Sequence, residues 1–164
     1  MSNKTLYNSA LEFAAEKHEG QYRKGGEPYI THPVAVAEIL REKGYGEEYL
    51  ITALFHDLLE DTDATEMEIL SLGGERVLKA VKLLTKENGY DMAEYVSRIR
   101  SDEIAFAVKA ADRLHNLRSA VFADDNFKRR YIAETREWYM DFCEEIAEAV
   151  IELEKTYGSV TIFR

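Results

Sequence analysis

Apolar residues recur at spacings of three and four along almost all of the 164-residue chain. This spacing is typical of helices that bury one face against a core. Strand-like alternation is confined to the short stretch SVTIF near the C-terminus. The pattern therefore predicts an all-α fold, with helices over residues 4–18, 33–43, 47–60, 65–73, 75–85, 91–100, 102–120 and one long final helix over about 124–157.

Several residues mark the ends of these helices. Pro33 fits the first position of a helix, where its missing N–H would be unpaired in any case. Thr65 and Glu68 form a capping-box pattern. Gly44 and the Gly73–Gly74 pair suit helix ends. The glycine-bearing segment EGQYRKGGEPYIT, residues 19–31, is predicted to be a loop.

The final helix carries an aromatic and aliphatic stripe. Such a stripe fits either the core of the fold or the seam of a homodimer. Its members are Phe127, Tyr131, Trp138, Phe142, Ile146, Val150, Leu153 and Tyr157.

Composition limits the function classes. The net charge of −10 disfavours nucleic acid and anionic membranes as partners, and an anionic substrate would need a local island of cations. A membrane-spanning run of about 18 apolar residues is missing, and the first residues lack an apolar signal core, so we expect a cytoplasmic protein. A single cysteine excludes an internal disulfide and a cysteine zinc knuckle. The length suits one domain.

The densest polar cluster within an apolar helix is ALFHDLLEDT, residues 53–62. Its ionisable members His56, Asp57, Glu60 and Asp61 are spaced to share a helix face. Three neighbouring acids repel one another, and a divalent cation would compensate them. The alternative is a histidine in the core with surface acids at a helix end.

A second cluster is VKAADRLHNLRS, residues 108–119. Asp112 and Asn116 are four residues apart on one face, and Arg118 could bind phosphate through two hydrogen bonds. Asp112 could be an oxygen ligand for a hard metal ion, or it could form an ion pair with a neighbouring arginine that holds helices together.

The loop contributes a local basic island, YRKGGEPY, with Arg23 and Lys24. Arginine and lysine together suit phosphate recognition, although exposed basic loops are also common without a ligand. Two imidazoles, His32 and His56, and the two carboxylates Asp57 and Asp112 form a mixed donor set that suits Mn²⁺, Fe²⁺ or Zn²⁺ better than Ca²⁺.

The order His…His-Asp…Asp on helices resembles the HD superfamily of metal-dependent phosphohydrolases. The stretches HEGQYRKGGEPYITHPVAVAEIL, ALFHDLLEDTDAT and VKAADRLHNLRS resemble the hydrolase domain of the RelA/SpoT family and its stand-alone small alarmone hydrolases. The resemblance covers a core of about 6–119 and leaves a helical extension of about 124–157. It implies a single HD-type helical domain over residues 1–164.

The resemblance also implies an activity: Mn²⁺-dependent hydrolysis of the 3′-pyrophosphate of guanosine tetra- and pentaphosphate. It places the metal on His32, His56, Asp57 and Asp112, and it matches Glu60 and Asp61 to the pair that activates or orients the attacking water. Arg23, Lys24 and Asn116 match positions beside the nucleotide, and we add Arg118 and Ser119 as expected substrate contacts. Ser119 replaces a frequent threonine and keeps the hydroxyl.

Two alternatives remain open. The chain could be an HD-type nucleotidase or pyrophosphatase for another nucleotide, including NADPH at its 2′-phosphate, or a catalytically silent module that binds alarmone. His18 and His115 are not assigned to the metal. We expect His115 to hydrogen-bond within the helix packing and His18 to end the first helix.

Overall fold

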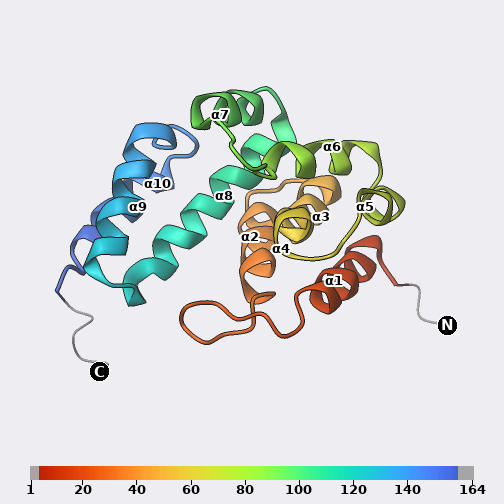
Figure 1. Ribbon diagram of the computed structural model, residues 1–164, viewed down its shortest axis with the longest axis horizontal. Helices are drawn as coiled ribbons and strands as arrows, with labels where there is room; N and C mark the ends of the chain where they lie inside the picture. Colours follow the sequence, from red (N-terminus) through yellow and green to blue (C-terminus); the bar gives the residue numbers. More distant parts are fainter. Residues whose placement is uncertain (1–3, 159–164) are drawn as a thin grey trace. The chain divides into compact units, whose positions relative to one another are not determined.

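The computed structural model describes residues 4–158, and helices provide nearly all regular structure in this range (Figure 1). The prediction of an all-α fold is confirmed, and the SVTIF stretch lies outside the described residues. The elements are α1 (Leu6–Lys17), α2 (Thr31–Glu42), α3 (Glu47–Phe55), α4 (Leu58–Asp61), α5 (Glu66–Gly73), α6 (Glu75–Leu84), α7 (Met92–Arg100), α8 (Glu103–Ser119), the 3₁₀ turn η1 (Ala120–Phe122), α9 (Asp125–Trp138) and α10 (Glu145–Glu154).

The chain divides into two compact units, residues 1–109 and 110–164, and the boundary falls within α8. The first unit holds α1 to α7 and the beginning of α8. The second holds the rest of α8 with α9 and α10. None of the helices within residues 4–158 is both long enough and apolar enough to cross a bilayer.

Helix α3 is the centre of the first unit. It contacts α1, α2, α5 and α6 (Figure 1), and residues 50–55 are all buried. A segment that is enclosed on every side is apolar nearly all round, which fits the run LITALF over residues 50–55. Leu54 and Phe55 are fully buried, and each such side chain contributes about 1.5–3 kcal/mol to folding. This packing fixes the end of α3, where the candidate site begins.

Local signals set most helix ends as predicted. The Thr65 side chain accepts a hydrogen bond from the Glu68 N–H, and the Glu68 side chain accepts one from the Thr65 N–H, so the capping box at α5 is confirmed. Gly44 follows α2 with φ of +86°, a left-handed conformation that costs glycine little.

Helix α2 begins two residues before the predicted start at Pro33. Thr31 is its first residue, so Pro33 occupies the third position. The first four N–H groups of a helix have no partner inside it, and proline is therefore tolerated there as well. As a result His32 belongs to the first turn of the helix, where it is buried.

The prediction of one helix over residues 47–60 is wrong. The structure has α3 and α4, separated by His56 and Asp57. The His56 ring bonds to the Ala53 carbonyl, and Asp57 has φ of −103° and ψ of −1°, away from regular helix geometry. A bond between a side chain and the backbone thus takes part in ending α3.

The prediction of one long final helix is also wrong. Helix α9 ends at Trp138, and α10 begins at Glu145. Tyr139 lies at the break, fully buried, with its ring 5.0 Å from the Phe142 ring. The turn lets α10 pack on α9, and Arg136 pairs with Glu154 between them at 2.8 Å. The apolar spacing holds within each helix, but neither glycine nor proline marks the break.

Candidate metal centre

The break between α3 and α4 presents His56 and Asp57 beside His32 of α2. Ligand atoms of these three residues lie within 4.8 Å of one another, and the two imidazole rings are 5.4 Å apart between centroids. Both histidines are buried and Asp57 is partly buried. The first unit therefore brings together three of the four residues that the sequence predicts as metal ligands.

The hydrogen bonding of His56 suits a metal ligand. Its Nδ1 lies 2.6 Å from the Ala53 carbonyl oxygen, which can only accept, so Nδ1 carries the proton. In the neutral ring this leaves a lone pair on Nε2, which lies 3.1 Å from Asp57 Oδ2. A lone pair and a carboxylate at this distance need a proton or a cation between them. A backbone carbonyl that fixes the tautomer is typical of metal-bound histidines, so the donor set fits a divalent ion.

Tyr29, in the loop before α2, supports the carboxylate of this set. Its hydroxyl donates to Asp57 Oδ2 at 2.5 Å. The sequence does not predict this contact, because nothing in the local pattern indicates which group a tyrosine in a loop will reach.

Glu60 and Asp61 lie one turn beyond Asp57 on α4, and carboxylate oxygens of the three acids lie within 4.8 Å of one another. Partial desolvation is the largest cause that raises the pKa of Glu60, and the charges of Asp57 and Asp61 add to it. The Lys86 N–H, which donates to the Glu60 carboxylate, opposes this rise in pKa. Desolvation and the Asp57 charge also raise the pKa of Asp61. These acids therefore hold protons more readily than ordinary carboxylates do.

The basic loop forms a small hairpin. Tyr22 and Pro28 form an isolated antiparallel bridge, and the Arg23 N–H donates to the Glu27 carbonyl at 2.8 Å. Gly26 turns the chain with φ of +92°. Arg23 is partly buried and Lys24 is exposed. The hairpin thus gives the two predicted phosphate contacts a defined backbone.

The remaining predicted residues lie in the second unit, on the last turns of α8. Asp112 is buried, and its Oδ1 accepts a hydrogen bond from Asn116 Nδ2 at 3.3 Å. Arg118 is exposed. The Ser119 hydroxyl donates to the His115 carbonyl at 2.8 Å and lies 3.4 Å from the His115 ring.

Arg113, the neighbour of Asp112, is buried against two aromatic rings and near one acid. Its guanidinium lies 4.2 Å from the Tyr131 ring centroid and 4.1 Å from that of Tyr139, and it is 3.5 Å from Glu134. Stacking between two aromatic faces compensates a buried guanidinium. The sequence pattern does not reveal this arrangement, because the two tyrosines come from a distant segment.

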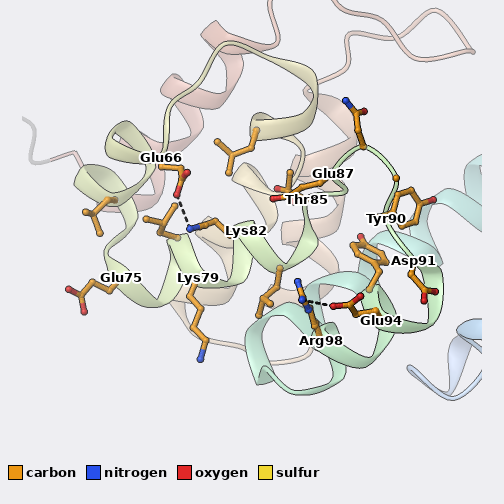
Figure 2. Close-up of a pocket in the computed structure, with 17 residues that line it drawn as sticks. Glu66, Glu75, Lys79, Lys82, Thr85, Glu87, Tyr90, Asp91, Glu94 and Arg98 are labelled. Carbon is orange, nitrogen blue, oxygen red and sulfur yellow. Dashed lines mark hydrogen bonds and ion pairs between the residues drawn. The ribbon is translucent and has the colours of Figure 1, made fainter.

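A separate pocket of about 1070 Å³ lies in the first unit, between α5, α6, α7 and residues 85–91 (Figure 2). Its described lining includes none of the predicted site residues. Two ion pairs, Lys82–Glu66 at 3.0 Å and Arg98–Glu94 at 2.5 Å, occupy part of its wall (Figure 2). Acidic side chains outnumber basic ones in the lining, so the pocket does not suit a polyphosphate.

The HD domain family matches residues 10–145, and the chain belongs to this family. A guanosine-3′,5′-bis(diphosphate) 3′-pyrophosphohydrolase of Aquifex aeolicus is 44% identical over 140 residues, which are 79% of this chain and 20% of that protein. A GTP pyrophosphokinase rsh of Brucella melitensis is 37% identical over 148 residues, or 84% of this chain and 20% of the relative. The chain thus spans about a fifth of the length of these relatives.

Solved structures agree on the fold. One, described as a metazoan ortholog of SpoT that hydrolyzes ppGpp, matches with a TM-score of 0.74 at 23% identity and covers 99% of both chains. Another, lmo0812 from Listeria monocytogenes, matches with a TM-score of 0.59 at 24% identity over 80% of this chain and 99% of the other. At these identities the likeness concerns the fold alone.

Proposed function

We propose that this chain removes pyrophosphate from the 3′ position of guanosine tetra- and pentaphosphate, with GDP or GTP as the other product. The observation that carries the proposal is the group of His32, His56 and Asp57 with two further acids beside it. The similarity to the Aquifex aeolicus pyrophosphohydrolase supports the choice of substrate.

The proposed metal ligands are His32, His56 and Asp57, with Asp112 as the fourth by its match to the family pattern. Mn²⁺ is the proposed ion, and Fe²⁺ or Zn²⁺ would suit the same nitrogen and oxygen donors. A bound dication supplies a water of lowered pKa and neutralises charge that develops on phosphorus.

The chain's own residues then act on water and phosphates. Glu60, oriented by the Lys86 N–H and assisted by Asp61, accepts a proton from the attacking water. The water oxygen bonds to the phosphorus nearest the ribose as the bond from that phosphorus to the ribose 3′ oxygen breaks, and that oxygen takes up a proton.

The remaining assignments concern the nucleotide. Arg23, Lys24 and Arg118 are proposed to bind the phosphates, because guanidinium and ammonium groups match phosphate oxygens. Asn116 and Ser119 are proposed to contact the sugar and base. The chain's net charge of −10 makes such cations the local attraction for a polyanionic substrate. A cytoplasmic location, where guanine nucleotides occur, is part of the proposal.

The test is pyrophosphate release from guanosine tetraphosphate with Mn²⁺ and with a chelator, beside a panel of other nucleotides that includes NADPH. The proposal expects release that depends on Mn²⁺ and exceeds that from the panel. Faster turnover of another nucleotide would move the function to a different phosphohydrolase. Binding of guanosine tetraphosphate without turnover would favour an alarmone sensor.

A further inference from the structure

We propose that His18 is a positioning residue that holds two sides of the candidate metal centre. One connection, the Tyr29 limb, runs from the face of the His18 ring to Tyr29 and the carboxylate of Asp57, a proposed metal ligand. The other connection, the Gln21 limb, runs from His18 Nδ1 through Gln21 to the main chain of Asp61. The kinetic part of this inference rests on the proposed function, whereas the metal-binding part does not.

The Gln21 limb follows from the directions of two hydrogen bonds. Gln21 Nε2 lies 2.8 Å from the backbone carbonyl oxygen of Asp61, which can only accept, so the amide nitrogen is the donor. Gln21 Oε1 therefore faces His18 Nδ1, at 2.8 Å, and must accept from it. The proton of His18 thus resides on Nδ1, and the chain of bonds runs from the end of α1 to the last residue of α4.

The Tyr29 limb is a ring contact. The His18 and Tyr29 rings lie 4.7 Å apart between centroids, at an interplanar angle of 43°. Tyr29 donates its hydroxyl proton to Asp57 Oδ2. The His18 ring therefore limits where the tyrosine can place its hydroxyl, and a donor to a metal-binding carboxylate is the kind of outer group that orients it.

The burial of His18 indicates that its polar ring is used. Only 2% of the residue is exposed, and among residues 4–158 its Nε2 has no hydrogen-bond partner. An unpartnered buried nitrogen costs free energy, which a phenyl ring of similar size would avoid. A purely space-filling role would thus be served better by phenylalanine, whereas a role through Nδ1 requires an N–H donor at that position.

Two substitutions separate the limbs. His18→Phe keeps a ring against Tyr29 and loses the donor to Gln21. His18→Asn keeps an N–H donor near the Nδ1 position and loses the ring. Gln21→Met removes both bonds of the Gln21 limb at a partly exposed position and leaves His18 intact. For each variant, the measurements are the unfolding midpoint, the affinity for Mn²⁺ alone, and kcat and KM for guanosine tetraphosphate at saturating Mn²⁺.

The two histidine variants should show opposite defects. For His18→Phe, kcat should fall about 10-fold with the Mn²⁺ affinity unchanged, since loss of an outer partner typically costs about 10- to 100-fold. For His18→Asn, the Mn²⁺ affinity should weaken about 10-fold while kcat at saturating metal is retained. Gln21→Met should reproduce the kcat defect of His18→Phe, and the double variant should lose little more, because both changes cut the same connection.

Three results would overturn the inference: a His18→Phe enzyme with unchanged kcat, a His18→Asn protein that binds Mn²⁺ as tightly as the parent, or losses that multiply in the double variant. If the His18 variants unfold, a Gln21→Met enzyme with parental kcat overturns it instead. A parent chain that fails to hydrolyse guanosine tetraphosphate would refute the proposed function, and the Mn²⁺ affinities would still decide the Tyr29 limb.

Discussion

Replacing Glu60 by glutamine separates the proposed base from the metal ligands. The Lys86 N–H donates to Glu60 Oε1, and the carbonyl oxygen of glutamine can accept the same bond with the same geometry. The substitution therefore changes charge and basicity and leaves the position of the side chain intact. Asp57 stays available to the metal, so the variant should still bind Mn²⁺.

This variant should change turnover and folding stability differently. A positioned general base contributes about 10²- to 10⁴-fold, so kcat should fall by about that factor, which corresponds to about 2.7–5.4 kcal/mol of activation free energy. Folding should not suffer. Desolvation and the neighbouring acids raise the pKa of Glu60, so the folded protein disfavours its charged form. A neutral glutamine removes this penalty, and the unfolding midpoint at pH 7 should stay the same or rise.

The assay is pyrophosphate release from guanosine tetraphosphate at saturating Mn²⁺, with calorimetric Mn²⁺ binding and thermal unfolding on the same samples. Glu38→Gln is the matched control, because Glu38 is an exposed residue of α2 whose carboxylate contacts Arg41. It should leave kcat unchanged. A Glu60→Gln enzyme with kcat similar to the parent's would refute the assignment of Glu60 as base, and loss of Mn²⁺ binding would make it a ligand instead.

Four further predictions concern stability and metal. Thr65→Ala removes the capping box of α5 and should cost about 1 kcal/mol in urea unfolding, with kcat unchanged; an unchanged midpoint would contradict the capping energy. Gly73→Ala would bring its Cβ to 2.6 Å from Val77 Cγ1 and should destabilise by about 1–3 kcal/mol. At Gly46, where a Cβ meets nothing within 4 Å, alanine should cost less; equal losses would refute the steric argument. Leu54→Ala should cost about 2–5 kcal/mol, as expected for a fully buried leucine, and a smaller loss would mean that α3 can repack. Mn²⁺ at about 100 times its dissociation constant should stabilise the fold by about 2.7 kcal/mol, reversibly by chelation; a midpoint that ignores Mn²⁺ would contradict a site built into the folded state.

The helices could be predicted because their signals are local. Apolar spacing and the Thr65–Glu68 pair depend on residues within one or two turns, and the structure has helices where they indicate. The two breaks could not be predicted in this way. His56 takes part in ending α3 through a side-chain bond to Ala53, and Tyr139 separates α9 from α10 while buried against Phe142. Both depend on side-chain contacts, with no glycine or proline as a marker.

The candidate site, too, could be predicted from the sequence only in part. The residue types of a nitrogen and oxygen metal centre are visible in the sequence, and the structure places His32, His56 and Asp57 within reach of one another. The sequence does not show which other groups contact these ligands. Tyr29 reaches Asp57 across 28 positions, and Gln21 reaches Asp61 across 40. Such contacts arise only when the loop before α2 folds against α4, so no spacing rule within one helix can predict them.

The proposed activity depends most on one dication, for which His32, His56, Asp57 and Asp112 are the proposed ligands. Anomalous diffraction from crystals grown with Mn²⁺ tests this directly. We expect one strong manganese peak, about 2.0–2.3 Å from a ring nitrogen of each histidine and from an oxygen of each aspartate. A peak bound elsewhere, or crystals with these four side chains ordered and no manganese between them at saturating Mn²⁺, would contradict it.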